Sequence, residues 1–265
     1  LFAEKSLQDK ERTQINRDYF AHTNASIFIP SEEEIFVSDG AKSDTALLSH
    51  LFSKKSRICV TDPVYPVYVD SNALFGKVQK APEGSSDPYT NVTYARATVE
   101  NAFCPLPPAT PCDLIYLCSP HNPTSSALSR KALQAWVDYA KAHCAVIIYD
   151  AAYSAFIEGA ELPKSIYEIP GAESVAIECG SFSKCASFTG IRSAWCVIPK
   201  ALQLKNVSVH TLWAQFKNVT YNGLSYPVQR AAAALLTDEG LAQTKALCAC
   251  YMQRAHKLHE GLKNS

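Results

Sequence analysis

Short apolar runs alternate with helical stretches along most of the chain. The candidate strands are residues 34–38, 57–62, 113–119, 145–150, 175–178 and 193–198. Several of them are apolar throughout, as is typical of strands buried on both faces of a sheet. The alternation predicts an α/β fold in which helices flank a mostly parallel sheet.

The clearest predicted helix covers Arg130–His143, with Ser129 as its N-cap. Its apolar face carries Leu133, Trp136, Val137 and Ala140.

Two more helices are expected at the end of the chain. One runs from near Pro227 to Leu236, and a long one starts at about Asp238. The proline-rich stretch 101–111 is expected to be irregular. We therefore divide the chain into a large ligand-binding domain, 1–235, and a long helix, 236–265. That helix is expected to lead towards a small domain that the sequence lacks.

Composition narrows the range of partners. The chain has 265 residues, 47% of them hydrophobic, and 25 basic residues balance 25 acidic ones. A neutral chain without basic clusters argues against nucleic acid and anionic membranes as partners. No apolar run reaches the ~20 residues of a membrane-spanning helix. We expect a cytoplasmic protein. Because the sequence begins at Leu1 rather than Met, a lost transit segment, and hence a plastid location, stays open.

The chain contains ten cysteines. Cys59, Cys118, Cys179 and Cys196 lie in strand-like runs, where we interpret them as small buried hydrophobic residues. His256 and His259 are three residues apart on the predicted terminal helix. No third ligand accompanies them, so we expect no metal site. We interpret the cysteines as reduced thiols.

Ligands of open α/β sheets bind beyond the carboxyl ends of the strands, so the residues there are candidates for a site. The turn before Ala41 and Lys42 opens a helix and offers free N–H groups to a phosphate, although an ordinary turn fits equally. Tyr65 lies between two prolines and could stack on a ligand ring or pack on the surface. Asn122 is also held between prolines, where a simple turn is the alternative.

The last two strand ends carry the strongest chemistry. Asp150 ends an apolar strand, where a buried carboxylate needs a partner such as a protonated ring nitrogen. Its alternative role is that of an N-cap. Further on, Ser181, Ser183 and Arg192 suit a phosphate, and Lys184 suits a Schiff-base nucleophile. An exposed lysine and a solvated arginine are the alternative. Successive strand ends with this chemistry together favour a cofactor site.

These motifs resemble those of the fold-type I aminotransferases, which use pyridoxal 5'-phosphate (PLP). The matching motifs, in the order of that family, are Asn-Pro-Thr at 122–124, Tyr-Asp-x-x-Tyr at 149–153, Ser-x-Ser-Lys at 181–184 and Gly-x-Arg at 190–192. Residues 37–42, 62–68, 188–192 and 221–223 are most similar to the LL-diaminopimelate aminotransferases of that family. The resemblance covers nearly the whole chain.

The resemblance implies a role for each matching residue. Three residues would be catalytic: Lys184 as the covalent anchor and proton carrier, Asp150 at the ring nitrogen, and Tyr153 at the phenolic oxygen. Asn122 would share that oxygen, and Tyr65 would stack on the ring. The phosphate would be held by Ala41, Lys42, Ser181, Ser183 and Arg192. Asn222 would reach the active site of the partner subunit in a homodimer.

The implied activity is transfer of an amino group from LL-2,6-diaminopimelate to 2-oxoglutarate in lysine biosynthesis. One alternative is a related amino-acid aminotransferase or a carbon–sulfur lyase on the same scaffold. The other is a truncated, non-catalytic module for PLP binding or dimerisation.

The chain also departs from the family's pattern. Ser125 replaces a glycine, and it would be strained if that position requires a positive φ. His121 and Ser187 stand where smaller or amide residues are usual. The family's C-terminal arginine for the substrate carboxylate has no counterpart in the sequence.

Overall fold

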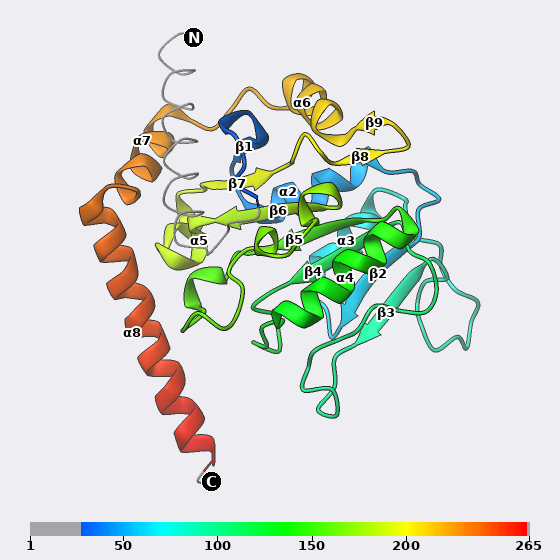
Figure 1. Cartoon of the computed structure of the whole chain (residues 1–265), viewed down its shortest axis with the longest axis horizontal. Helices are drawn as coiled ribbons and strands as arrows, with labels where there is room; N and C mark the ends of the chain where they lie inside the picture. Colours follow the sequence, from blue (N-terminus) through cyan, green and yellow to red (C-terminus); the bar gives the residue numbers. More distant parts are fainter. Residues whose placement is uncertain (1–27, 264–265) are drawn as a thin grey trace.

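Seven strands form one sheet at the centre of the computed structural model, which describes residues 28–263 (Figure 1). The strands are β1 (Ile35–Ser38), β2 (Ile58–Asp62), β3 (Val92–Arg96), β4 (Leu114–Cys118), β5 (Val146–Asp150), β6 (Ala176–Ser181) and β7 (Ala194–Val197). Their order is β1-β7-β6-β5-β4-β2-β3. All neighbouring strands are parallel except that β7 runs against both β6 and β1. The predicted mostly parallel α/β sheet is confirmed.

All six predicted strands are present, with two differences from the prediction. No local pattern predicts β3, because this edge strand pairs only with β2 and its Arg96 is exposed. Strand β6 continues to Ser181, three residues beyond the predicted end, because its last residues pair with β7.

Helices cover both faces of the sheet (Figure 1). One hydrophobic cluster contains α4 (Arg130–His143) and residues of α7 (Tyr226–Leu235). The other contains residues of α2 (Ala41–Leu48), α3 (Val67–Leu74) and α6 (Val209–Thr220).

The helix α4 forms as predicted. Its four apolar side chains are fully buried, and the Ser129 hydroxyl accepts the Ala132 N–H at 3.2 Å.

Short elements make several of the connections. They are α5 (Phe182–Cys185), the hairpin of β8 (Gln203–Leu204) and β9 (Val207–Ser208), and the 3-10 helices η1 (Glu32–Glu34), η2 (Ser49–Leu51), η3 (Ser154–Phe156), η4 (Ile166–Glu168), η5 (Ala172–Ser174) and η6 (Phe188–Gly190). The stretch 101–111 contains no helix or strand, as predicted.

The two predicted terminal helices are α7 and α8 (Asp238–Lys263). The first half of α8 packs near α5, where Cys248 is buried, and the second half extends past the sheet (Figure 1). The domain boundary after residue 235 stays a prediction. The first 27 residues of the predicted large domain lie outside the described part of the chain.

All ten cysteines are free thiols, and the four in the predicted strands are buried. Within residues 28–263, no three His, Cys, Asp or Glu side chains gather closely enough to hold a metal ion. None of the described helices is both long and apolar enough to cross a membrane.

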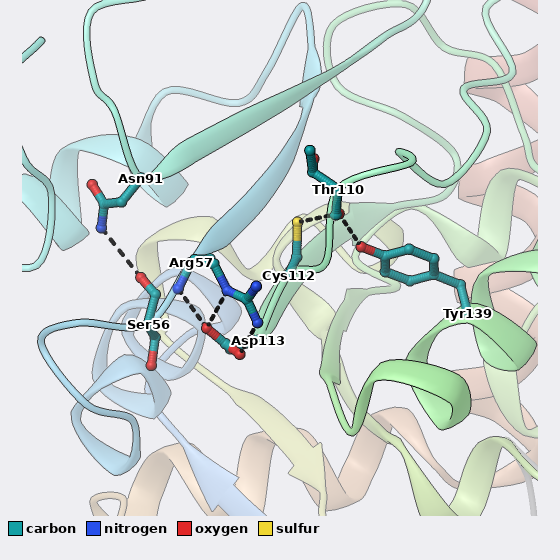
Figure 2. Close-up of polar contacts among 7 residues, drawn as sticks. All are labelled: Ser56, Arg57, Asn91, Thr110, Cys112, Asp113 and Tyr139. Atoms are coloured by element: carbon teal, nitrogen blue, oxygen red, sulfur yellow. Dashed lines mark hydrogen bonds and ion pairs between the residues drawn. The ribbon is translucent and has the colours of Figure 1, made fainter.

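Polar side chains form hydrogen bonds with one another at the edge of the sheet where the parallel strands begin (Figure 2). The Arg57 guanidinium donates to both carboxylate oxygens of Asp113, at 3.1 and 2.8 Å. Asn91 donates to the Ser56 carbonyl at 3.2 Å. These contacts join the residues that precede β2, β3 and β4. The polar groups at this edge are therefore paired with one another within the chain.

Candidate active site

A cavity of about 340 Å³ lies at the opposite edge, where β1, β2, β4, β5 and β6 end. Its volume is in the range of small-molecule sites, about 300–1,000 Å³. It is lined by Ala41, Lys42, Tyr65, Tyr68, Cys118, Asn122, Asp150, Ala152, Tyr153, Ser181, Ser183, Lys184, Thr189 and Arg192. All ten residues that the sequence assigned to a cofactor are in this set. Asn222 is not; it is exposed beyond the end of α6.

One end of the cavity carries groups that suit an anion. The helix α2 starts at Ala41, and the N–H groups of its first turn have no partners within the helix. The Arg192 guanidinium packs directly against Gly40, where an added Cβ would clash with its Nη2 atom. Arg192 also donates to the Thr189 carbonyl at 2.6 Å. A guanidinium and the amino end of a helix therefore meet in one place.

The segment after β6 brings two hydroxyls and a lysine to the same cavity. Ser181 ends the strand and caps α5, its hydroxyl accepting the Ser183 N–H at 3.1 Å. The Thr189 hydroxyl donates to the Ser183 carbonyl at 2.8 Å. Lys184 is exposed on α5, and its Nζ lies 5.6 Å from the centroid of the Tyr153 ring. The amine is therefore both held near the cavity and accessible.

A buried carboxylate forms another wall. Asp150 is only 7% exposed, and it accepts the Tyr68 hydroxyl at 2.7 Å and the Ala152 N–H at 3.0 Å. Burial raises the pKa of Asp150, whereas the two hydrogen bonds and the charge of Lys184 act in the opposite direction. An ionised carboxylate in this position is strongly favoured by a cationic ligand atom beside it.

Two tyrosines and an amide complete the cavity. Burial raises the pKa of Tyr153, and a hydrogen bond with Asn122 opposes the shift. Tyr65 meets Tyr68 edge to face, with ring centroids 5.4 Å apart. An aromatic face and two polar groups are therefore available to a planar ring.

Two of the departures noted in the sequence have left-handed backbone conformations. Ser125 has φ of 61° and Ser187 has φ of 56°. Because such values favour glycine, the condition under which serine was expected to strain position 125 is met.

Four lining residues were missed by the sequence: Tyr68, Cys118, Ala152 and Thr189. Tyr68 is the most important of them because it donates to Asp150. Its only signal was its place one helical turn after Tyr65 in the Pro66-initiated helix α3.

The sheet order and the lysine, carboxylate and arginine of the cavity agree with what the comparison with protein families found. The family model for class I and II aminotransferases matches residues 12–265, and the chain belongs to this family.

Individual relatives are more specific. The chain is 50% identical to the LL-diaminopimelate aminotransferase of Agathobacter rectalis over 232 residues, which are 88% of this chain and 57% of that protein. It is 49% identical to the enzyme of the same name from Desulfotalea psychrophila, covering 84% of this chain and 55% of that one.

A solved structure agrees with the fold. The L,L-diaminopimelate aminotransferase from Chlamydomonas reinhardtii superimposes with a TM-score of 0.88 and 36% identity, over 97% of this chain and 62% of that one. The chain therefore spans little more than half the length of the curated relatives it matches.

Proposed function

We propose that the cavity binds PLP and that the chain is the cofactor-binding part of an LL-diaminopimelate aminotransferase. Its reaction would transfer an amino group from LL-2,6-diaminopimelate to 2-oxoglutarate in lysine biosynthesis, in the cytoplasm. The observation that carries this proposal is the meeting of Lys184, Asp150 and the anion-binding end in one cavity. The names of the relatives support the substrate, and the family generally depends on PLP.

The residues present fit this cofactor. The first turn of α2, the hydroxyls of Ser181 and Ser183, and Arg192 suit a phosphate dianion. The clash that a Cβ at Gly40 would cause shows how closely the guanidinium approaches this helix end. At the other wall, Asp150 suits a protonated pyridine nitrogen. The bound cofactor would supply an electron sink for the substrate's Cα.

The protein side chains would hold and move protons. Lys184 would hold the cofactor through its amine, and the same amine would carry the proton of the substrate's Cα. Asp150, fixed by Tyr68 and the Ala152 N–H, would keep the ring nitrogen protonated. Tyr153 and Asn122 would bind the phenolic oxygen.

We also propose a homodimer in which Asn222 reaches the partner subunit's site. Lys42, Lys184 and Thr189 are exposed on this chain, so the cavity has an open side that a second subunit could cover. Asn222 lies away from the cavity of its own chain, which is consistent with a role in the other one.

The test is the visible absorption spectrum of the purified chain after addition of PLP. Wild type is expected to develop the band of a lysine-bound cofactor, and Lys184→Ala is expected to lack it. Lys55→Ala is the matched control, because Lys55 is exposed in the turn before β2, at the end of the sheet opposite the cavity.

A band retained in Lys184→Ala would refute the assignment of the anchor. Bleaching of the wild-type band by LL-diaminopimelate would support the substrate. A band that does not respond would limit the chain to cofactor binding.

A further inference from the structure

His121 is buried in the loop between β4 and α4, beside the cavity residue Asn122. Only 6% of its surface is exposed. The loop closes on itself there, since the His121 N–H donates to the Ser126 carbonyl and the Ser125 N–H donates to the His121 carbonyl, both at 2.7 Å. Each ring nitrogen also faces a threonine hydroxyl: Nε2 lies 2.9 Å from Thr61 and Nδ1 lies 2.8 Å from Thr124.

The contacts around this imidazole fix the proton on its Nδ1 side. The Ser126 hydroxyl donates to the Phe103 carbonyl at 2.9 Å, and a carbonyl can only accept. Ser126 must therefore accept from the Thr124 hydroxyl, which lies 2.8 Å away. With its proton used, Thr124 must in turn accept from Nδ1–H of His121.

The remaining ring nitrogen follows from the charge of the ring. Burial lowers the pKa of His121 and so favours the neutral imidazole. Neutral imidazole carries one N–H, so Nε2 is an acceptor. The Thr61 hydroxyl lies 2.9 Å from Nε2 and 3.2 Å from the Pro63 carbonyl, and it donates to the nearer of the two. The result is a one-way chain of hydrogen bonds, from Thr61 through His121, Thr124 and Ser126 to the Phe103 carbonyl.

We propose that neutral His121, protonated on Nδ1, is a positioning residue that locks the Asn122 loop to the end of β2. The loop that bears Tyr65 leaves from the same strand end, so His121 fixes two walls of the cavity relative to each other. The inference rests on the proposed function, because it gives Asn122 and Tyr65 their roles at the cofactor ring.

The Thr61 hydroxyl has a second acceptor within reach. It also lies 3.2 Å from the Pro63 carbonyl. If His121 became an imidazolium, Nε2 would turn into a donor, and Thr61 would donate to Pro63 instead. Hydroxyls of β2 and of its own loop face the imidazole, and Tyr153 shares a neighbouring cavity with it. Acid would therefore reverse the hydrogen bond between Nε2 and the Thr61 hydroxyl.

The first experiment reads the proton positions directly. Nitrogen NMR of the whole chain, labelled with 15N-histidine, is expected to show His121 as a neutral ring with the proton on Nδ1 at pH 7.5. The signal is assigned by its loss in His121→Asn. An Nε2–H tautomer or an imidazolium at this pH would overturn the proposed chain.

The second experiment separates positioning from mere packing. Thr61→Val and Thr124→Val keep the side-chain shape but remove a hydroxyl, and each is expected to weaken PLP binding about tenfold, as loss of one hydrogen bond would. Thr61→Ser and Thr124→Ser restore the hydroxyl and should restore affinity. PLP binding is followed by the visible band.

The outcomes distinguish the two proposals. If the valine variants melt at a lower temperature but bind PLP as wild type does, His121 has only a structural role and the inference fails. If wild type itself does not bind PLP, the proposed function fails, and with it the role of His121 at the cofactor.

Discussion

Two buried aspartates lie near the proposed site, and their surroundings give them different uses. Asp150 faces the cavity and has room for a cationic ligand atom beside it. Asp44 lies inside the fold on α2, where it accepts the Ser38 hydroxyl and its Oδ1 is 3.9 Å from Lys217 Nζ. Burial raises the pKa of Asp44 to about 7. Asp44 therefore ionises near neutral pH without contacting the ligand cavity.

This shift predicts how stability depends on pH. Because the pKa of the Asp44 carboxyl is higher in the folded chain than its ordinary value of 3.8, the folded state binds more protons between pH 3.8 and pH 7. Stability should therefore fall as pH rises towards 7, by at most about 4 kcal/mol. Asp44→Asn cannot ionise and should flatten this fall.

The measurement is urea unfolding at pH 5.5 and pH 8. Asp138→Asn is the control, because Asp138 is exposed on α4 and should keep the wild-type pH dependence. An unchanged fall in Asp44→Asn would show that other groups cause it.

At the scale of residues, a site residue could be predicted from the sequence when its type was unusual for its position in a strand or turn. An aspartate at the end of an apolar strand is conspicuous, and so is a lysine that follows two serines. Tyr68 was missed because an aromatic residue in a half-buried helix is ordinary, and its partner Asp150 is 82 positions away. A contact over that distance depends on the sheet order, which local patterns do not contain.

At the scale of elements, α2 connects the sheet to the anion-binding end. It begins directly after β1 without a side-chain cap, because Gly40 occupies the cap position and leaves space for Arg192. The free N–H groups of the first turn are thus left to a ligand rather than to a capping hydroxyl.

Gly40→Ala is expected to displace the Arg192 guanidinium and to weaken PLP binding at least about tenfold, as loss of a charged hydrogen bond would. The backbone at Gly40 is extended, so alanine should not disturb the fold. Gly261→Ala, where an added Cβ also meets nothing within 4 Å and which lies near the end of α8, is the matched control. PLP titration of both variants checks this, and equal affinities would contradict it.

Elements with a clear local signal were predictable from the sequence. The helix α4 has an N-cap and one apolar face, and its predicted bounds agree with the structure. The strand β3 has neither a buried run nor regular alternation, so only its pairing with β2 identifies it. The end of β6 was misjudged for a similar reason, since its last residues are defined by their partners on β7.

At the scale of the whole molecule, the two edges of the sheet have separate tasks. The edge with Arg57 and Asp113 is held by polar contacts within the protein (Figure 2), and the opposite edge carries the cavity of the proposed cofactor site. Stability and ligand binding should therefore respond to different substitutions.

Arg57→Gln is expected to lower the free energy of unfolding by less than about 1 kcal/mol, because both partners of the ion pair are partly exposed. The affinity for PLP should not change. Urea unfolding and PLP titration of the same sample check both parts. A loss of PLP affinity would show that the two edges are coupled.

The reversed direction of β7 has a consequence for how the cavity assembles. Because β6 and β7 are antiparallel neighbours, Ser181, Lys184 and Arg192 all belong to one short connection between adjacent strands. Closing such a short loop costs little chain entropy. Bringing Tyr68 to Asp150 requires a loop of 82 residues to close through several intervening strands. The lysine half of the cavity is thus a local, hairpin-like unit, whereas the carboxylate half depends on the register of the whole sheet.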